Sequence, residues 1–280
     1  MVEWAPAHYG GRMPTLPAEQ PPPAPGESHQ QRQVAESFGA SADRYDRARP
    51  GYPDAMVARI VAASPGPDVL DVGVGTGIAA RQFRAAGCRV LGVDPDPRMA
   101  GLARQSGLDA EVARFEDWDP AGRTFDVVIA GQSWHWVDPV AGGARAAQVL
   151  RDGGRLALFW NAYLPPDEVN QAFGAVYRRV LPDLPYGGNG LPGPDGYAVL
   201  GARALAQAAG FGPAEEWRFD WQRTFTRAAW LDLVPTMGGF SRMTPGQQDG
   251  LLTGMGAAVD SFGGSFTMTS ATVVLTATRT

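Results

Sequence analysis

A short strand, a glycine-rich turn and the start of a helix follow one another at residues 69–83, VLDVGVGTGIAARQF. Glycines in such a turn permit a tight reversal and a close approach of the backbone to a bound cofactor. This unit constrains the fold more than any other feature, because a strand followed by a crossover helix leads into a second, parallel strand. We therefore expect an α/β fold.

Strands and helices keep alternating after this unit. The expected strands are short and mostly apolar, as central parallel strands are, at residues 69–72, 89–93, 110–112, 125–130 and 155–160. Helical spacing is found between them, at residues 78–86, 97–106 and 139–150. The alternation predicts a doubly wound, mostly parallel sheet that helices cover on both faces.

Three parts are expected along the chain. Residues 1–33 are rich in proline, which blocks helix and sheet hydrogen bonds, so they are predicted to form a flexible leader. The alternative for this leader is a segment that covers a site or a partner subunit, as in a homodimer. Residues 34–162 hold two N-terminal helices, the second near residues 54–63, and the core that binds the cofactor.

The pattern changes from residue 163 to residue 280. Helices are expected near residues 168–180 and 199–209, then a strand at 216–224, two more helices and a β-rich end at 265–279. We interpret this part as a helical lid over the substrate, followed by strands that complete the parallel sheet with an antiparallel edge.

Composition excludes several classes of protein. No apolar run approaches the ~20 residues that span a bilayer, and no secretory signal is recognisable, so a cytoplasmic protein without a membrane partner is expected. The one cysteine, Cys88, rules out an intramolecular disulfide. With a net charge of −5 and no basic cluster, the chain is not expected to bind nucleic acid. It contains no lysine, which excludes Schiff-base chemistry.

Two acids distinguish between the cofactors that the glycine turn could hold. Asp71 precedes the glycines, where it would repel the pyrophosphate of a dinucleotide. S-adenosylmethionine has no phosphate and carries a positive sulfonium and a positive ammonium, so an acid there is favourable. Asp94 closes the next strand, where a carboxylate can accept hydrogen bonds from ribose hydroxyls. The alternative for both acids is helix capping or a surface charge.

Four ordered motifs resemble the class I S-adenosylmethionine-dependent methyltransferases: VLDVGVGTG, VLGVDPDPRM, ARFEDWD and FDVVIAGQSWHWVDP. The chain is most similar to the small-molecule group that includes relatives of trans-aconitate methyltransferase. The resemblance covers residues 34–162 and implies a seven-stranded Rossmann-like methyltransferase fold. Val74 departs from it, because the family commonly has cysteine or a small polar residue there.

The resemblance also implies where S-adenosylmethionine, and its product S-adenosylhomocysteine, would bind. The implied cofactor-binding residues are Asp71, Gly73, Gly75 and Gly77 at the methionine end, Asp94 at the ribose, Pro95, Met99, Phe115 and Glu116 at the adenine, Gln132 and Ser133 beside the methyl group, and Tyr45 and Arg49 over the carboxylate. For Phe115 and Met99 the alternative is the apolar core, and for Arg49 it is the surface or a helix cap.

The run after the fourth strand would face the methyl acceptor, a small molecule. His135 is the candidate general base, and its alternative is a structural histidine. Trp134 and Trp136 would stack on the acceptor or pack in the core. No metal is expected, since Asn161 alone follows the fifth strand where metal-dependent relatives have an Asp-Asn pair.

The function expected from these features is methyl transfer to an oxygen, nitrogen or carbon atom of a small, aromatic or hydrophobic molecule of the secondary-metabolite type. Two alternatives stay open. One is a protein that binds S-adenosylmethionine in a regulatory or non-methylating role. The other is an NAD-dependent oxidoreductase, because residues 75–80 also match the GxGxxA pattern.

Overall fold

The computed structural model describes residues 38–182 and 193–280, and the expected leader at residues 1–33 lies outside these ranges. One seven-stranded sheet organises the described chain, with the strand order β3-β2-β1-β4-β5-β7-β6. The strands are β1 (Asp68–Val72), β2 (Arg89–Asp94), β3 (Asp109–Val112), β4 (Phe125–Gly131), β5 (Leu150–Leu164), β6 (Glu215–Thr226) and β7 (Ser265–Thr278). The first five run parallel, and β7 runs antiparallel to both β5 and β6. The doubly wound sheet with an antiparallel edge is therefore confirmed.

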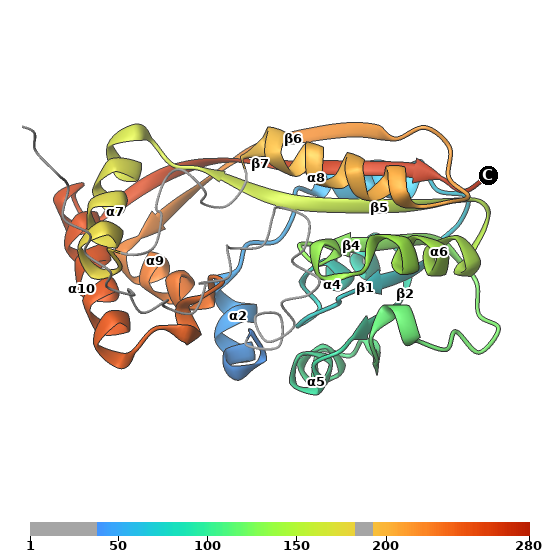
Figure 1. The fold of residues 1–280 in the computed structure, drawn as a ribbon, viewed down its shortest axis with the longest axis horizontal. Coiled ribbons are helices and arrows are strands. Elements are labelled where there is room, and N and C mark those ends of the chain that lie inside the picture. The colour runs from blue at the N-terminus through green and yellow to red at the C-terminus, as the bar shows by residue number, and fades with distance from the viewer. Residues whose placement is uncertain (1–37, 183–192) are drawn as a thin grey trace, which may run out of the picture.

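Helices cover both faces of the sheet (Figure 1). Met56 and Ile60 of α3 (Asp54–Ala62) and Phe83 of α4 (Ile78–Ala85) pack with Ile129 and Phe159 on one face. The other face is covered by α6 (Pro139–Val149) and α8 (Pro194–Gln207), whose buried side chains join a core with the strands. The helix α5 (Pro97–Gln105) packs beside β2 and β3.

A second core lies at the far ends of the long strands. Phe225 of β6 and Phe266 of β7 pack there with Phe173 of α7 (Asp167–Val180) and Trp230 of α9 (Arg227–Leu233). Leu251 of α10 (Pro245–Ser261) completes this distal cluster, which Figure 1 shows at the end of the molecule away from β1 and β2. The helices that were expected to form a lid therefore pack against the ends of β6 and β7, and their role as a lid stays a prediction.

The N-terminal helix bridges the two cores. It comprises the 3-10 turn η2 (Phe38–Ser41) and α2 (Ala42–Ala48), and Ala48 is buried in the distal cluster. Arg47 donates two hydrogen bonds of 2.9 Å to Asp232 in α9. On its other side, Asp46 forms an ion pair of 2.6 Å with Arg81 in α4. The helix is thus tied both to the lid and to the helix that follows the glycine turn.

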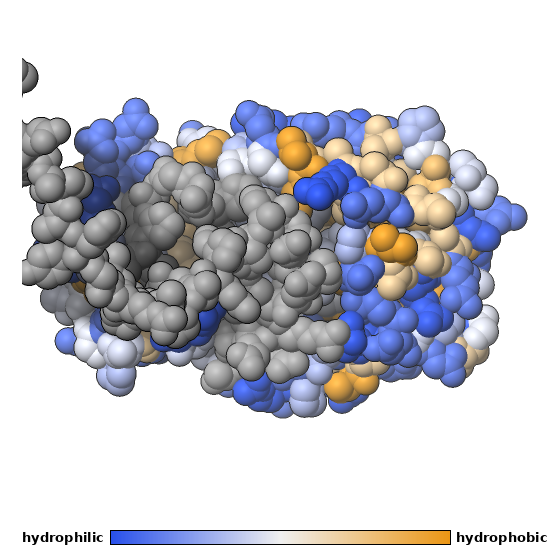
Figure 2. Space-filling model, in the orientation of Figure 1, coloured by the Kyte–Doolittle hydropathy of each residue, from blue (hydrophilic) through white to orange (hydrophobic). Residues whose placement is uncertain are grey.

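Figure 2 shows that the coloured part of one face is mostly hydrophilic, with scattered apolar spots. Among the described residues the large apolar side chains that are exposed are Val112, Val140 and Val199. None of the described helices is both long and apolar enough to cross a membrane.

Candidate functional site

The ends of β1, β2 and β4 bring the predicted site residues together at one edge of the sheet. Asp71 pairs in register with Gly92 of β2 and with Ile129 of β4. The glycine turn crosses to the neighbouring strand, because the backbone N–H of Gly73 donates to the Val93 carbonyl at 2.8 Å. The N–H of Gly75 donates to Asp94 Oδ2, also at 2.8 Å. The two acids and the turn form one connected unit, as their spacing predicted.

The three glycines of the turn have backbone conformations that favour glycine, with φ of 70° at Gly73, 55° at Gly75 and 92° at Gly77. A Cβ on Gly73 would lie 2.4 Å from Cβ of Ser133, and a Cβ on Gly77 would lie 2.4 Å from Leu108. At Gly75 the nearest atom would be 4.0 Å away. Gly73 and Gly77 are therefore required by packing, whereas Gly75 leaves space beside the backbone where a ligand can approach.

Asp71 is buried, and its Oδ2 atom has no hydrogen-bond partner among the described residues. Burial, together with the nearby charge of Asp94, raises the pKa of Asp71 to about 7. A backbone hydrogen bond from Ala80 lowers this pKa and so offsets part of the rise. A buried carboxylate oxygen without a donor is costly. It fits a ligand that brings a positive charge or a hydrogen-bond donor, and it does not fit a pyrophosphate.

Asp94 closes β2 and is fully hydrogen-bonded to the backbone. Its Oδ1 accepts from Asp96 N and its Oδ2 from Gly75 N, each at 2.8 Å. Burial raises the pKa of Asp94 to about 6, while these two backbone hydrogen bonds act against the rise. Each oxygen retains a second lone pair, so the carboxylate can still accept from a ribose hydroxyl.

The residues predicted at the adenine differ in their burial. Met99 is buried in α5, whereas Pro95 is exposed at the start of the same turn. Phe115 packs in the core against the rings of Trp118 and Trp134. Phe115 and Met99 are therefore both buried, as their alternative of an apolar core position requires, whereas Pro95 is exposed directly after Asp94.

Glu116 has structural partners. Its Oε1 accepts a hydrogen bond of 3.0 Å from Asp138 N, at the start of α6, and lies 3.4 Å from Arg114 Nη2. In this arrangement its carboxylate holds the loop after β3 against α6. A contact with the adenine amino group would need the second carboxylate oxygen or a different rotamer.

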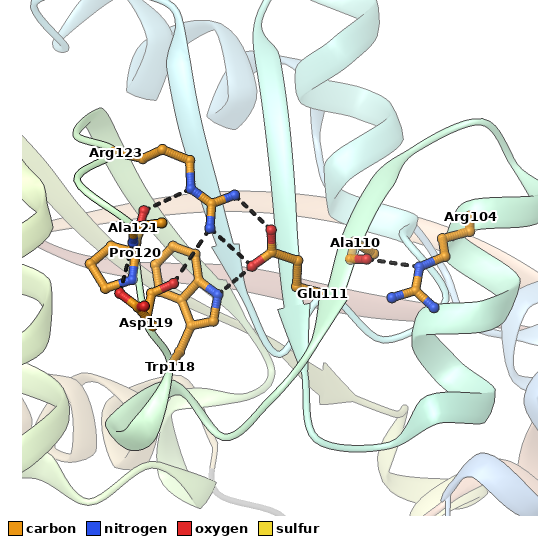
Figure 3. Close-up of polar contacts among 8 residues, drawn as sticks. All are labelled: Arg104, Ala110, Glu111, Trp118, Asp119, Pro120, Ala121 and Arg123. Atoms are coloured by element: carbon orange, nitrogen blue, oxygen red, sulfur yellow. Dashed lines mark hydrogen bonds and ion pairs between the residues drawn. The ribbon is translucent and has the colours of Figure 1, made fainter.

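The loop around Phe115 is itself held in place from β3 (Figure 3). Glu111 accepts hydrogen bonds of 2.6 Å from both Trp118 Nε1 and Arg123 Nη1. Arg104 in α5 donates to the Ala110 carbonyl at 2.8 Å on the other side of the strand. This network fixes the strand, the loop and α5 relative to one another, and so fixes the wall beside Asp94.

The end of β4 contains a strained residue. Gln132 has a φ of 58°, which is uncommon for a residue with a side chain, and its Nε2 donates to the Asn161 carbonyl at 3.3 Å. Ser133 turns back and donates from Oγ to the Val72 carbonyl at 2.5 Å. The two residues therefore connect β4 to β5 and to β1 at the predicted position of the methyl group.

The residues Trp134, His135 and Trp136 form a single 3-10 turn, η4 (Trp134–Trp136). Trp134 is buried in the core with the strands, whereas Trp136 is only half-buried and its ring centroid lies 4.6 Å from that of His135. Trp134 therefore belongs to the core, and Trp136 is the better placed of the two for an acceptor.

His135 accepts a hydrogen bond of 3.3 Å at Nδ1 from Trp160 Nε1. Since the indole nitrogen can only donate, this bond requires an unprotonated Nδ1, and neutral His135 carries its proton on Nε2. Burial lowers the pKa of His135 to about 4. With one nitrogen engaged and the other protonated, His135 has no lone pair free to act as a general base in this arrangement.

Arg49 lies just after α2 and reaches the lid. Its Nε donates to Thr236 Oγ1 at 2.9 Å, its Nη2 donates to the Thr236 carbonyl, and its guanidinium lies 5.1 Å from the Tyr45 ring centroid. Thr236 belongs to η5 (Val234–Thr236), the turn after α9. The predicted pair of Tyr45 and Arg49 is thus brought together, and it lies at the junction between α2 and the lid.

Tyr52 lies at the site and was missed by sequence reasoning, and Asn161 and Tyr163 make further hydrogen bonds there. A Cβ on Gly131, at the end of β4, would lie 2.7 Å from the Tyr52 hydroxyl. Asn161 Nδ2 donates to the Gly51 carbonyl at 3.2 Å, and Tyr163 forms a side-chain hydrogen bond with Arg49. The sequence signal that could have located Tyr52 is its position in RYDRARPGY, three residues after Arg49.

Val74 points away from this site. It is buried beside α5, and a Cβ on Gly92 would lie 2.7 Å from it. Across residues 38–182 and 193–280, no group of three or more His, Cys, Asp or Glu residues could hold a metal ion.

Residues 70–158 match a protein family described as a methyltransferase domain. A methyltransferase of Mycobacterium tuberculosis whose substrate is not assigned is 38% identical over 133 residues, which are 46% of this chain and 54% of that protein. The trans-aconitate 2-methyltransferase of Mycolicibacterium gilvum is 33% identical over 141 residues, 49% of this chain and 50% of that enzyme. The chain therefore matches about half the length of these curated relatives.

A solved structure from Anaeromyxobacter dehalogenans has the same fold over most of the described chain. The superposition has a TM-score of 0.59 and covers 81% of this chain and 97% of that one, at 23% sequence identity. The likeness thus extends beyond residue 158 into the strands that complete the sheet.

Proposed function

We propose that this chain transfers the methyl group of S-adenosylmethionine to a small-molecule acceptor, a proposal supported by the match of residues 70–158 to a methyltransferase domain. The observation that carries the proposal is the buried Oδ2 atom of Asp71, which has no partner among the described residues, together with the open space beside the backbone of Gly75, four residues later in the chain. A cationic methionine end supplies what both positions lack.

Each part of the site would contribute to binding. Asp71 would attract the ammonium and sulfonium groups, and the backbone at Gly75 would let the ligand approach closely. Asp94 would accept hydrogen bonds from the ribose hydroxyls. When bound, S-adenosylmethionine supplies a methyl group that the sulfonium has already activated, so the chain mainly has to align the acceptor and exclude water.

The acceptor would lie beyond Gln132, next to Trp136, Tyr52 and the end of β5. His135 would stay neutral and could donate a hydrogen bond from Nε2–H. It would not remove a proton from the acceptor. Aromatic side chains surround this region, among them Trp160 and Tyr197, whose rings stack with centroids 5.7 Å apart. These rings support a small aromatic or hydrophobic acceptor of the secondary-metabolite type.

Calorimetric titration with S-adenosylhomocysteine tests the cofactor site, with NAD as the parallel ligand. We expect micromolar binding of S-adenosylhomocysteine, none of NAD, and a loss of about tenfold or more, roughly 1.4 kcal/mol, in Asp94→Ala. Asp109→Ala is the matched control, because Asp109 is an exposed acid at the start of β3, away from the turn. Tighter binding of NAD, or equal binding by wild type and Asp94→Ala, would refute the assignment.

A further inference from the structure

The strand β6 is an edge of the sheet (Figure 1), and within the described chain it pairs only with β7. This pairing is regular from Glu215 to Thr226, without a bulge. Over residues 38–182 and 193–280 no further backbone hydrogen bond reaches residues 215–226. A free edge of this kind presents backbone N–H and C=O groups that can pair with another strand.

Most features that prevent edge strands from pairing are missing from β6. Such strands are usually short, bulged or interrupted by proline. The opposite edge of the sheet, β3, has only four residues, whereas β6 has 12 residues and contains neither proline nor glycine. One face of β6 consists of exposed polar and charged side chains: Glu216, Arg218, Asp220, Gln222 and Thr224. The order of the charges therefore decides which pairings this edge allows.

The charges distinguish between the ways in which β6 could pair with a second copy of itself. Opposed residues must lie on the same face of the sheet, so the two-fold axis passes through one pair of identical residues. Three antiparallel registers pair nine or more residues, with the axis at Phe219, Asp220 or Trp221. The axis at Asp220 opposes two carboxylates, which is unfavourable, and the axis at Trp221 opposes no charges at all.

The axis at Phe219 brings opposite charges together. Arg218 then lies opposite Asp220 of the second copy, and Glu215 lies opposite Arg223. Symmetry makes each of these pairs occur twice. Arg223 forms no ion pair with any acid of the described residues, so a carboxylate of a second copy would supply its counter-charge.

The other face of β6 favours the same register. With the axis at Phe219, the two Phe219 rings oppose each other and Trp217 opposes Trp221. Trp217 is buried, while Phe219 and Trp221 are half-buried. Opposed aromatic side chains stabilise an antiparallel pair, and this pairing would cover the remaining surface of both half-buried rings.

We propose that two copies of this chain associate through β6, antiparallel and with the two-fold axis at Phe219, so that their sheets join into one. The paired stretch runs from Glu215 to Arg223 and is about 30 Å long at the usual rise of an antiparallel strand. The strands β4, β5 and β7 separate β6 from β1, which leads into the glycine turn. The interface therefore does not include the glycine turn and is independent of the proposed function.

Sedimentation equilibrium of the full chain tests this interface. We expect the wild type to be a dimer of the 29.7 kDa chain. Arg218→Asp sets two carboxylates opposite each other and should raise the dissociation constant at least tenfold, and Asp220→Arg should do the same with two guanidinium groups. A one-to-one mixture of the two variants should associate again, because each chain then faces the opposite charge.

Arg178→Asp is the matched control. Arg178 is an exposed arginine of α7, and its reversal changes the net charge as much as Arg218→Asp does. This variant should keep the wild-type dissociation constant. Circular dichroism should be unchanged in all the variants, because Arg178, Arg218 and Asp220 are exposed.

Cysteine cross-linking identifies the register. Phe219→Cys places two thiols directly opposite each other, at a Cα separation that a disulfide can span, and should give a covalent dimer under mild oxidation. Asp220→Cys and Trp221→Cys would cross-link readily only in the two other registers. The native Cys88 is buried and stays in all three variants.

Four results would overturn the proposal. These are a wild type that is monomeric at ~100 μM, a dimer that both charge reversals leave intact, a mixture of the two reversed variants that associates no better than either alone, and cross-linking of Asp220→Cys or Trp221→Cys in preference to Phe219→Cys. A dimer that survives both reversals would indicate another interface.

Discussion

Burial of the Asp71 carboxylate lowers the stability of the ligand-free protein and would favour the binding of a cationic ligand. Its carboxylate is buried and incompletely hydrogen-bonded, and Asp94 lies close by with its own raised pKa. The folded chain therefore holds a proton on Asp71 more tightly than the unfolded chain does. A cationic ligand relieves this cost by pairing with the ionised form.

The pH dependence of stability follows from the sign of this shift. The folded pKa of Asp71 is about 7, above the ordinary value of about 4 for an aspartate. Its contribution to stability is therefore favourable below about pH 4 and is lost as the pH rises through 7. Asp71→Asn should therefore stabilise the ligand-free protein at pH 8, by roughly 2–4 kcal/mol, and have little effect at pH 4. Urea unfolding at both pH values measures this, and S-adenosylhomocysteine affinity should fall in the same variant.

Asp68 provides the control of opposite sign. The hydrogen bond from Arg89 lowers the pKa of Asp68, and Arg151 also pairs with it. Asp68→Asn should thus destabilise the protein at pH 8, by less than ~1 kcal/mol because the pairs are exposed. If Asp71→Asn also destabilised the protein at pH 8, the burial cost assigned to Asp71 would be wrong.

His135 offers a second test at this scale. The pKa of His135 is lowered to about 4 by burial, so its imidazole proton signals should titrate far below about pH 6.5, the ordinary midpoint of a histidine. A proton NMR titration from pH 3 to 8 measures this, and His135→Gln identifies the signal. A midpoint between 6 and 7 would reinstate His135 as a general base.

Sequence reasoning anticipated the contacts between the proposed cofactor residues better than the contacts around Arg49. Asp71, Gly75 and Asp94 follow strands that pair directly, so their spacing along the chain already fixes their meeting point. Arg49 forms hydrogen bonds with Tyr163 and Thr236, which lie 114 and 187 residues further along the chain. No local pattern encodes such contacts.

At the scale of elements, the glycine turn and the end of β4 depend on each other. Gly73→Ala should destabilise the protein, because the new Cβ would lie 2.4 Å from that of Ser133, and Ser133→Gly in the same chain should recover part of the loss. The Gly75→Ala protein should lose no more than the ~1–2 kcal/mol of unfolding free energy that a left-handed alanine costs. It should bind S-adenosylhomocysteine at least tenfold more weakly.

Urea or thermal unfolding measures the effect on stability, and calorimetry measures the effect on binding. The four variants are Gly73→Ala, Ser133→Gly, the double variant of these two, and Gly75→Ala. An additive double variant would show that Gly73 and Ser133 do not interact. Unchanged S-adenosylhomocysteine affinity in Gly75→Ala would show that the open space beside Gly75 is not where the ligand approaches.

The boundaries of the elements show what local pattern can predict. The ends of β1, β2, β4 and α4 differ from the expected ones by one residue, because the apolar runs and glycines mark them. In contrast, β5 was expected to end at Trp160 and runs to Leu164, since β7 pairs with it throughout. The helix α8 begins at Pro194, five residues before the expected Val199, because proline at its first position fits a helix as well as a turn.

On the scale of the whole molecule, three strands connect the two cores. One end of β7 pairs Ala277 with Leu156 of β5 in the main sheet, and the other pairs Phe266 with Phe225 of β6 in the distal cluster. Thr272 lies between them, where it donates to Asn161 Oδ1 at 2.7 Å and accepts from Trp221 Nε1 at 3.0 Å. The acceptor side is therefore part of the same hydrogen-bonded sheet as the cofactor side.

This continuity limits how such an enzyme can acquire a new substrate. A lid carried on a separate domain can be exchanged between relatives by recombination at a linker. Here a crossover after β5 would pair that strand with the β7 of another chain, along the whole stretch from Arg155 to Leu164. A change of specificity is then expected to come from point substitutions that keep this sheet intact, and directed evolution of the proposed acceptor side should mutate its side chains instead of grafting whole segments.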